Sequence, residues 1–221
     1  MLLKDIRKEI PEELFAVLEK EGIKKLTPCQ EKSIKAGLLK RKNLLVCTPT
    51  ASGKTLVAEL AMLKEILEHR KKAIYIVPLK ALANEKYDLF THRYAHLCKI
   101  TLSIGNLDSA DPYLDKYDLI VCTAEKFDSL IRHHAPWLRK IGIAIIDEIH
   151  LLNDVGRGPT LEILITILQR LLPNLHLIAL SATIGNPKKL ASWLKAELIL
   201  DEWRPVKLKK GVFYNNKIIF P

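Results

Sequence analysis

Two segments of the sequence carry residue types that could do phosphate chemistry. The first is a loop of small residues that lies between an apolar run and a helical pattern: Thr48, Pro49, Thr50, Ala51, Ser52, Gly53, Lys54 and Thr55. Small residues let backbone N–H groups surround phosphate oxygens, and the following helix N-terminus adds a partial positive charge. Lys54 could then reach the terminal phosphates of a nucleotide, and the Thr55 hydroxyl could bind Mg²⁺. The spacing matches a phosphate-binding loop, except that Thr48 stands where glycine is expected.

The second segment is an apolar run that ends in two acids, Asp147 and Glu148. Asp147 is placed to hold Mg²⁺, directly or through water, and Glu148 to orient and deprotonate an attacking water. A strand that merely ends in two surface acids is the simpler alternative. Two observations weaken this alternative. The Lys54-Thr55 loop follows another predicted strand earlier in the chain, and in open α/β sheets ligands bind at the carboxyl ends of the strands.

Strand and helix patterns alternate along the chain. Nearly continuous Val, Ile and Leu runs are typical of strands buried on both faces. The strand candidates are 44–47, 73–77, 99–103, 119–122, 141–146, 175–180 and 197–200, and the helical patterns between them are 54–70, 79–95, 124–133, 160–172 and 187–194. Two further helices are predicted before the first strand, over 11–20 and from Thr27 onward. The alternation predicts an α/β fold with a parallel, doubly wound sheet.

Composition narrows the class of protein without fixing its partner. The chain has 35 Lys and Arg against 25 Asp and Glu, a net charge of +10. Such an excess fits a polyanionic partner such as nucleic acid, or equally a lysine-rich thermophilic surface. The four cysteines show no zinc-ligand spacing, and the charged N-terminus does not resemble a signal peptide. No apolar run approaches a membrane span, so we expect a soluble, cytoplasmic protein.

Several motifs together resemble those of superfamily 2 helicases. The run Asp147-Glu-Ile-His150 is similar to their DExH box, and members of this superfamily usually replace the first glycine of the phosphate loop, as Thr48 does here. Four further boxes follow the same order: 26–30 resembles the Q motif, 78–82 motif Ia, 123–126 motif Ib and 181–183 motif III. The runs 156–162, 183–186 and 203–205 resemble the Ski-type branch, and most the archaeal Hjm type of DNA helicase. The resemblance covers nearly the whole chain.

This resemblance implies a fold and a function. The implied fold is a three-layer, RecA-like P-loop NTPase domain with a mostly parallel sheet flanked by helices. The implied function is that of the first motor lobe of an ATP-dependent DNA helicase, an ATP hydrolase with 3′-to-5′ polarity that acts in DNA repair or at stalled forks. ATP and Mg²⁺ are the expected cofactors. Single-stranded or branched DNA is the expected partner of a monomer without membrane contact. An RNA helicase of the Ski type, a small-molecule P-loop kinase and a non-catalytic nucleic-acid-binding module are the alternatives.

Roles for individual residues follow from the same resemblance, each beside a structural alternative. Gln30 is implied to contact adenine, whereas Thr27-x-x-Gln30 is also the pattern of a helix capping box. His150 is implied to link the nucleotide site to motif III. Ser181 and Thr183 are implied to couple hydrolysis to strand movement, whereas a hydroxyl pair at this point could also cap the next helix.

The residues expected to grip nucleic acid follow the ends of strands or lie in a glycine-flanked loop. By resemblance they contact the phosphates of one strand, in a sequence-independent and salt-sensitive way. Solvated side chains are the alternative for the lysines. Arg157 is the stronger candidate among the cations because its glycine neighbours permit a close approach to another backbone. The set is Pro78, Lys80, Thr123, Lys126 and Arg157.

The predicted organisation is one motor lobe with short additions. We expect N-terminal helices with the Q motif, packed on the lobe, over 1–40, the RecA-like ATP-binding lobe over 41–202, and an extended tail over 203–221 that leads toward a second lobe. No second set of boxes follows Thr183 in the sequence, and the tail ends in an apolar run. We therefore expect a piece of a longer helicase that binds nucleotide but hydrolyses it slowly by itself.

Overall fold

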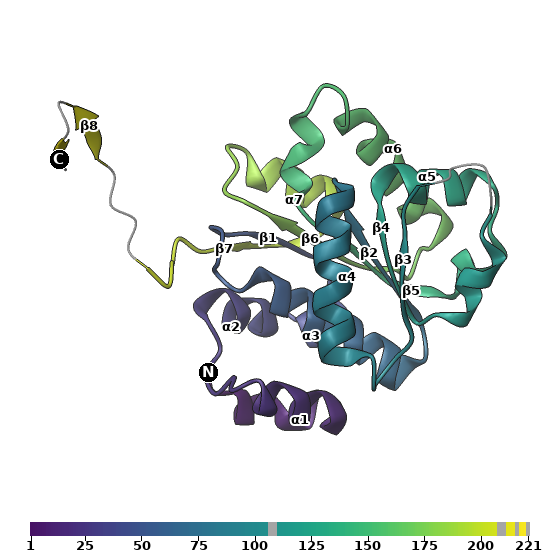
Figure 1. Ribbon diagram of the computed structural model, residues 1–221, viewed down its shortest axis with the longest axis horizontal. Coiled ribbons are helices and arrows are strands. Elements are labelled where there is room, and N and C mark those ends of the chain that lie inside the picture. The colour runs from purple at the N-terminus through teal and green to yellow at the C-terminus, as the bar shows by residue number, and fades with distance from the viewer. Residues whose placement is uncertain (106–109, 207–210, 215–216, 220–221) are drawn as a thin grey trace.

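A seven-stranded parallel sheet forms the centre of the computed structural model, which describes all residues except 106–109, 207–210, 215–216 and 220–221. Its strand order is β3-β4-β2-β5-β6-β1-β7, and every pairing in it is parallel. Figure 1 shows this sheet with helices around it. The strands are β1 (Leu44–Cys47), β2 (Lys72–Val77), β3 (Ile100–Ser103), β4 (Leu119–Thr123), β5 (Ile141–Ile146), β6 (His176–Ser181) and β7 (Glu197–Leu200).

Helices cover both faces of the sheet, because successive strand residues point to opposite sides. Leu44 and Val46 pack into one core with α1 to α4, whereas Leu45 and Cys47 pack into the other with α5 to α7. This arrangement is the predicted three-layer fold, and the uninterrupted apolar strands reflect burial on both faces. The helices are α1 (Glu12–Lys20), α2 (Pro28–Lys35), α3 (Lys54–His69), α4 (Lys80–Tyr94), α5 (Ala124–Arg132), α6 (Gly158–Leu171) and α7 (Pro187–Leu194).

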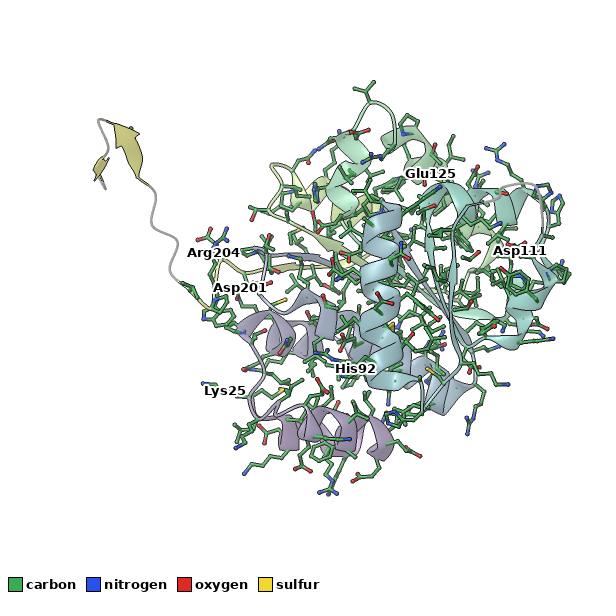
Figure 2. The ribbon with its side chains drawn as sticks, viewed as in Figure 1. Lys25, His92, Asp111, Glu125, Asp201 and Arg204 are labelled. Carbon is green, nitrogen blue, oxygen red and sulfur yellow. The ribbon has the colours of Figure 1, made fainter. Side chains whose placement is uncertain are left out.

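The N-terminal segment shares a core with the sheet. Leu14 and Leu18 of α1 are fully buried in the same cluster as Leu60 of α3. Farther along this segment, the Lys32 ammonium of α2 lies 2.7 Å from a carboxylate oxygen of Asp201. Asp201 follows β7 and is labelled in Figure 2. These contacts hold the segment that precedes β1 against the rest of the molecule.

Short 3₁₀ helices fill several of the connections. They are η1 (Leu3–Glu9), η2 (Leu38–Lys40), η3 (Pro112–Lys116), η4 (Pro136–Lys140) and η5 (Ile149–Asn153). Beyond β7 the chain leaves the sheet, and β8 (Val212–Tyr214) pairs antiparallel with β9 (Lys217–Ile219) away from it (Figure 1). The predicted extended tail falls here, and parts of it lie outside the described residues. None of the helices described is long and apolar enough to cross a membrane.

Candidate active site

The two phosphate-chemistry segments meet at the carboxyl edge of the sheet. In the strand order, β6 lies between β5 and β1, so the DExH acids, motif III and the phosphate loop leave three adjacent strands. The backbone N–H of Thr48 donates to the carbonyl of Ser181 at 3.2 Å, which ties the loop after β1 to the end of β6. Three segments far apart in the sequence thus form one surface.

The phosphate loop turns through two left-handed residues. Ala51 has φ 64° and Gly53 has φ 94°, and Gly53 is the residue that precedes the first residue of α3. Thr48 does not adopt a positive φ, so this position has no need of glycine. Its hydroxyl instead lies 2.6 Å from that of Ser52, fully buried. Where the usual motif has glycine, the threonine side chain at position 48 therefore forms a hydrogen bond across the loop.

Lys54 begins α3 and folds back over the loop. Its ammonium donates to the carbonyls of Thr48 at 2.7 Å and Pro49 at 2.9 Å. Burial lowers the pKa of Lys54, while the nearby carboxylates of Glu148 and Asp147 act in the opposite direction. The half-buried ammonium is thus held between the loop and the acids, at the N-terminus of a helix.

Gln30 connects the N-terminal helix α2 to the same loop. Its Oε1 accepts from the N–H of Thr27 at 2.8 Å, so the predicted capping box is present. Its Nε2 donates to the carbonyl of Gly53 at 3.1 Å, and the Thr27 hydroxyl donates to the carbonyl of Ser52 at 2.8 Å. A Cβ at position 53 would stand 2.3 Å from Gln30 Nε2, so glycine is needed there for this approach as well as for its positive φ.

The acid pair follows β5 directly, and the backbone fixes its geometry. Glu148 takes φ 53°, a left-handed conformation that a non-glycine residue adopts at a cost. Its N–H donates to Asp147 Oδ1 at 3.0 Å, and its Oε2 lies 3.2 Å from Nδ1 of His150. Asp147, Glu148 and His150 are all partly accessible. The two carboxylates consequently have different neighbours, as distinct roles require.

Tyr75 is a site residue that the sequence motifs did not reveal. It lies in β2, next to β5, and is fully buried with its ring edge-on to Phe90. Its hydroxyl donates to Asp147 Oδ2 at 2.7 Å. With the N–H of Glu148 on the other oxygen, both oxygens of Asp147 have a donor. A tyrosine among the aliphatic residues of the run 73–77 was the only hint of such a role in the sequence. Its partner Asp147 becomes apparent only from the pairing of β2 with β5.

Motif III separates into a buried and an exposed residue. Ser181 is fully buried beside Cys47, whose pKa is raised to about 11 by burial. Thr183 is exposed. Asn186 occupies the N-cap position of α7 without a side-chain capping bond, so neither Ser181 nor Thr183 stands at the start of that helix, and the alternative of a hydroxyl pair capping it is wrong.

The residues predicted to grip nucleic acid differ in how they present their charge. Lys80, at the start of α4, and Arg157, just before α6, are exposed, and Pro78 is half-buried. Lys126 is only 3% exposed, and its ammonium lies 2.8 Å from a carboxylate oxygen of Asp111, labelled in Figure 2. The Thr123 hydroxyl accepts from the N–H of Lys126 at 3.4 Å and caps α5. Thr123 is the last residue of β4, and Pro78, Lys80 and Lys126 follow β2 or β4, which end at the same edge as the acids.

A cavity of about 540 Å³ opens beside the phosphate loop. Gly22, Ile23, Gln30 and Gly53 contribute to its wall, together with Arg93 of α4. Arg93 is fixed by the buried carboxylate of Glu59, 3.2 Å away. The cavity has both apolar and polar lining residues and adjoins the loop that holds Lys54.

Comparisons with known proteins agree with this geometry. The family model of the DEAD/DEAH box helicases matches residues 27–190. The chain is 49% identical over 211 residues to the ATP-dependent DNA helicase Hel308 of Pyrococcus abyssi, covering 96% of this chain and 29% of the relative. It is 50% identical over 216 residues to that of Methanocaldococcus jannaschii, covering 95% of this chain and 18% of the relative. The chain thus spans less than a third of these relatives.

Solved structures show the same architecture. The crystal structure of the DUF1998 helicase MrfA matches with a TM-score of 0.76 and 28% identity, covering 87% of this chain and 33% of that one. MrfA bound to DNA and AMPPNP matches with a TM-score of 0.75 and 27% identity, covering 88% and 29%. With the family model spanning most of its length, the chain belongs to the DEAD/DEAH box helicase family.

Proposed function

We propose that this chain is the ATP-binding first motor lobe of an ATP-dependent DNA helicase. The observation that carries the proposal is the meeting of Lys54, the Asp147–Glu148 pair and Ser181 on three adjacent strand ends. Relatives that bear the name ATP-dependent DNA helicase Hel308 support DNA as the nucleic acid. Neither the alternative of a small-molecule kinase nor that of an RNA helicase has a supporting observation in this structure.

The residues present fit ATP with Mg²⁺. Mg²⁺ in proteins is held by one or two carboxylates plus substrate phosphates rather than by an all-protein cage. Consistent with this, the described residues contain no group of three or more His, Cys, Asp and Glu side chains that could hold a metal ion. Asp147 and the Thr55 hydroxyl would bind the ion, which when bound would neutralise charge on the phosphates. Asp147 already has its carboxylate oriented by Tyr75 and the N–H of Glu148.

The chain's own groups then divide the work of hydrolysis. Lys54 would exchange the carbonyls of Thr48 and Pro49 for phosphate oxygens, because a charge-assisted hydrogen bond to phosphate is stronger than one to a neutral carbonyl. Glu148, on its left-handed backbone, would accept a proton from the attacking water. His150, whose Nδ1 lies 3.2 Å from Glu148 Oε2 without a hydrogen bond to it, would link the nucleotide site to the motif III strand.

The cavity beside the loop is the proposed adenine site. Gln30 lines it while its amide bonds Thr27 and Gly53. The capping bond uses one lone pair of Oε1, and the bond to Gly53 uses one hydrogen of Nε2. An acceptor and a donor position remain for the base edge. The two interpretations of Gln30 are therefore compatible, and the cap would hold the amide in the orientation that the base reads.

The nucleic acid would lie across the loops that follow β2 and β4. Lys80 and Arg157 are the exposed cations of the predicted set, and they would contact phosphates. Lys126, ion-paired with Asp111, would act by holding its loop and would leave the contact to backbone N–H groups. Such contacts carry no sequence information.

The experiment that tests this function is ATPase stimulation of the full-length protein. We expect single-stranded or branched DNA to stimulate turnover more than RNA of the same sequence. Charge removal in Lys80→Ala/Arg157→Ala should weaken stimulation and reduce its salt dependence. Stronger stimulation by RNA would contradict a DNA helicase, and phosphate transfer to a metabolite without nucleic acid would contradict a motor lobe.

A further inference from the structure

A basic rim lies at the amino edge of the sheet, opposite the active site. Three loops that enter neighbouring parts of the sheet carry cations just before the strand begins: Arg41 before β1, Lys71 before β2 and Arg139 before β5. These residues are far apart in the sequence, but β2 pairs with β5, and only β6 separates β5 from β1. Because the strands are parallel, all three loops reach the same edge.

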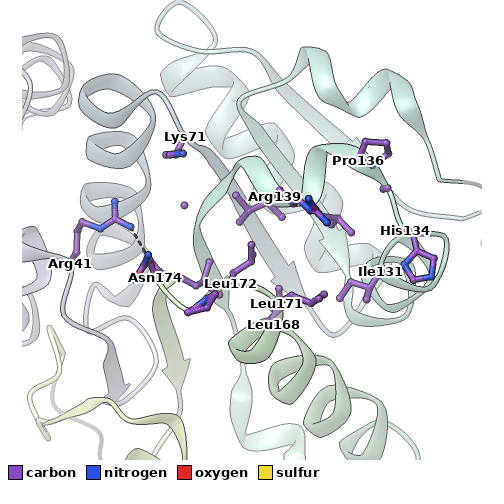
Figure 3. A pocket seen from close by; sticks show the side chains of 16 residues that line it. Arg41, Lys71, Ile131, His134, Pro136, Arg139, Leu168, Leu171, Leu172 and Asn174 are labelled. Atoms are coloured by element: carbon purple, nitrogen blue, oxygen red, sulfur yellow. Dashed lines mark hydrogen bonds between the residues drawn. The ribbon is translucent and has the colours of Figure 1, made fainter.

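These three cations help to line a hollow of about 810 Å³, together with His134 and Pro136 (Figure 3). Its apolar lining comes from the ends of α5 and α6 and from η4, with Ile131, Leu138, Leu168, Leu171 and Leu172 as the larger side chains. Leu171 is 56% exposed at the edge of this lining. The lining residues include no Asp or Glu.

The cations at this edge are not equivalent. Arg41 is fixed, with one guanidinium nitrogen 2.5 Å from the buried carboxylate of Glu65 and another donating to the carbonyl of Asn174 at 3.0 Å, the contact drawn in Figure 3. Lys72 and Lys140 directly follow the lining residues Lys71 and Arg139 in the sequence, and both contact Asp115. These three have partners within the fold.

Lys71 and Arg139 are different. Both are exposed, and neither forms a salt bridge with any residue in the described part of the chain. Their charges lie beside an apolar lining in which Leu171 is exposed and Leu172 is partly exposed, whereas Leu168 is buried beneath them in the core. Positive charge around a hydrophobic hollow is complementary to a carboxylate-bearing segment with an apolar anchor.

We propose that this hollow docks an acidic amphipathic peptide segment of a partner protein. An apolar side chain of the segment packs on Leu171 and Leu172. Carboxylates on either side of the anchor pair with Lys71 and Arg139, and Arg41 forms a pre-positioned wall. The partner is defined by this chemistry, alternating acidic and large aliphatic residues.

The lining favours a peptide over nucleic acid. Single-stranded nucleic acid is held by aromatic side chains on which bases stack, in addition to cations. No Phe, Tyr or Trp lines the hollow, whose floor is aliphatic. A surface built only for phosphates also gains nothing from a half-exposed leucine.

The docking surface is separate from the proposed nucleotide site, because the two lie at opposite ends of the parallel strands. A segment bound at the amino edge therefore leaves Lys54, Asp147 and Glu148 accessible. Binding there would attach the motor to a partner without competing with nucleotide.

Binding of a fluorescently labelled peptide with alternating Glu and Leu residues tests the proposal. We expect the protein to bind it, and the charge reversal Lys71→Glu/Arg139→Glu to weaken binding by about tenfold or more. Leu171→Ser should weaken it as well, and a peptide with Gln in place of Glu should bind as weakly as the reversal variant. Lys4→Glu/Lys20→Glu changes two exposed lysines of η1 and α1 and serves as the matched control, with binding unchanged.

Several results would overturn the docking proposal. Equal binding by the charge-reversal variant and the control would remove Lys71 and Arg139 from the site. Equal binding of the Glu and Gln peptides would show that charge plays no part. Displacement of the peptide by oligothymidylate at low concentration, with the same sensitivity to Lys71→Glu/Arg139→Glu, would identify a nucleic-acid surface instead. Circular dichroism of each variant checks that the fold is intact.

Discussion

At the scale of single residues, the phosphate loop is closed by its own lysine. The Lys54 ammonium uses the carbonyls of Thr48 and Pro49 as temporary acceptors, and it lies close enough to Asp147 and Glu148 for their charges to affect its pKa. In our proposal the ammonium leaves these carbonyls for the oxygens of a phosphate bound by the same loop. Glu148 has no such bond to the loop and is oriented by its own backbone.

The first prediction separates the roles of these two residues. In the full-length protein, Glu148→Gln should keep ATP binding and lower turnover by about 10²–10⁴-fold, because the amide cannot accept the proton of water. Lys54→Ala should weaken both binding and turnover. Equilibrium binding of a fluorescent ATP analogue and steady-state ATPase assays measure the two effects. Wild-type turnover in Glu148→Gln would exclude that residue as the base.

The second prediction concerns Tyr75, the buried donor to Asp147 Oδ2. If Asp147 binds Mg²⁺, Tyr75→Phe should weaken the metal dependence of nucleotide binding by about 10–100-fold, since partners of a metal ligand contribute that much. Binding measured in EDTA should not change. A Mg²⁺ titration of nucleotide affinity provides the measurement.

A matched control exists for Tyr75 in the same core. Tyr94 is also fully buried, and its hydroxyl donates to a carboxylate, Glu59 Oε2, at 2.7 Å. Tyr94→Phe removes the same chemical group without touching Asp147, so it should leave the Mg²⁺ titration as in the wild type. If the two variants shift the titration equally, the effect of Tyr75 is only structural.

At the scale of elements, helix α2 and the phosphate loop form one unit through Gln30. Its amide caps α2 at Thr27 and bonds the carbonyl of Gly53, so the helix start and the loop cannot move independently. The capping pattern could be read from the sequence. The bond to Gly53 could not, because it depends on how α2 packs beside α3.

The third prediction follows from this double role. Gln30→Ala should lower the preference for ATP over GTP by about tenfold, the value of one lost hydrogen bond in a site of this kind. Thr27→Val also disturbs the unit by removing the bond to Ser52, but it leaves the Gln30 amide in place and should keep the preference. Competition binding of the two nucleotides decides. An unchanged preference in Gln30→Ala would leave the cap as its only role.

The fourth prediction concerns the strand β6, which begins with a buried histidine. His176 is 2% exposed, Nε2 lies 3.0 Å from the carbonyl of Lys42, and burial lowers its pKa from 6.5 to about 4. The unfolded chain therefore binds a proton that the folded chain does not bind between these values. The stability contributed by neutral His176 is complete above about pH 6.5 and is lost as the pH falls toward 4, at up to about 1.4 kcal/mol per unit.

Urea denaturation at a series of pH values measures this loss. His176→Gln keeps a donor for the carbonyl of Lys42 but does not titrate, so its free energy of unfolding should fall less steeply below pH 6.5. Parallel pH profiles for the variant and the wild type would show that other groups cause the acid sensitivity.

Most elements could be located from the sequence because their periodicity is strong. The runs 44–47, 141–146 and 197–200 are strands with the predicted bounds, and β2 begins one residue earlier than predicted. That residue is Lys72, a buried lysine whose ammonium donates to the carbonyls of Asp115 and Tyr117, so a charge occupies a strand position. Composition alone could not anticipate it, because the acceptors come from a distant segment.

At the scale of the whole molecule, our proposal gives this chain one wall of a nucleotide site. The phosphate loop, acid pair and motif III all come from this lobe. An arginine finger supplied by a surface that faces the phosphates contributes about 10³–10⁵ in rate in other phosphoryl-transfer enzymes. This chain covers 29% of one curated relative and 18% of another, so those relatives are long enough to contain further domains.

The fifth prediction is that the 221-residue chain by itself binds ATP but hydrolyses it slowly. ATP with Mg²⁺ should raise its Tm, because a ligand that binds only the folded state stabilises it. DNA should stimulate its turnover far less than that of the full-length protein, and it should not unwind a duplex. Brisk DNA-stimulated hydrolysis by the purified chain would contradict the need for a second wall.

The sequence by itself determined the parallel α/β fold, the phosphate loop and the acid pair. These features are local: a strand followed by a small-residue loop or by two acids can be read from neighbouring residues and their periodicity. Only the tertiary structure decided that Tyr75 holds Asp147, that Lys126 is buried against Asp111 and that Lys71 and Arg139 flank one hollow. Each of these depends on the order of strands in the sheet, which brings together residues far apart in the chain and is not encoded in any single segment.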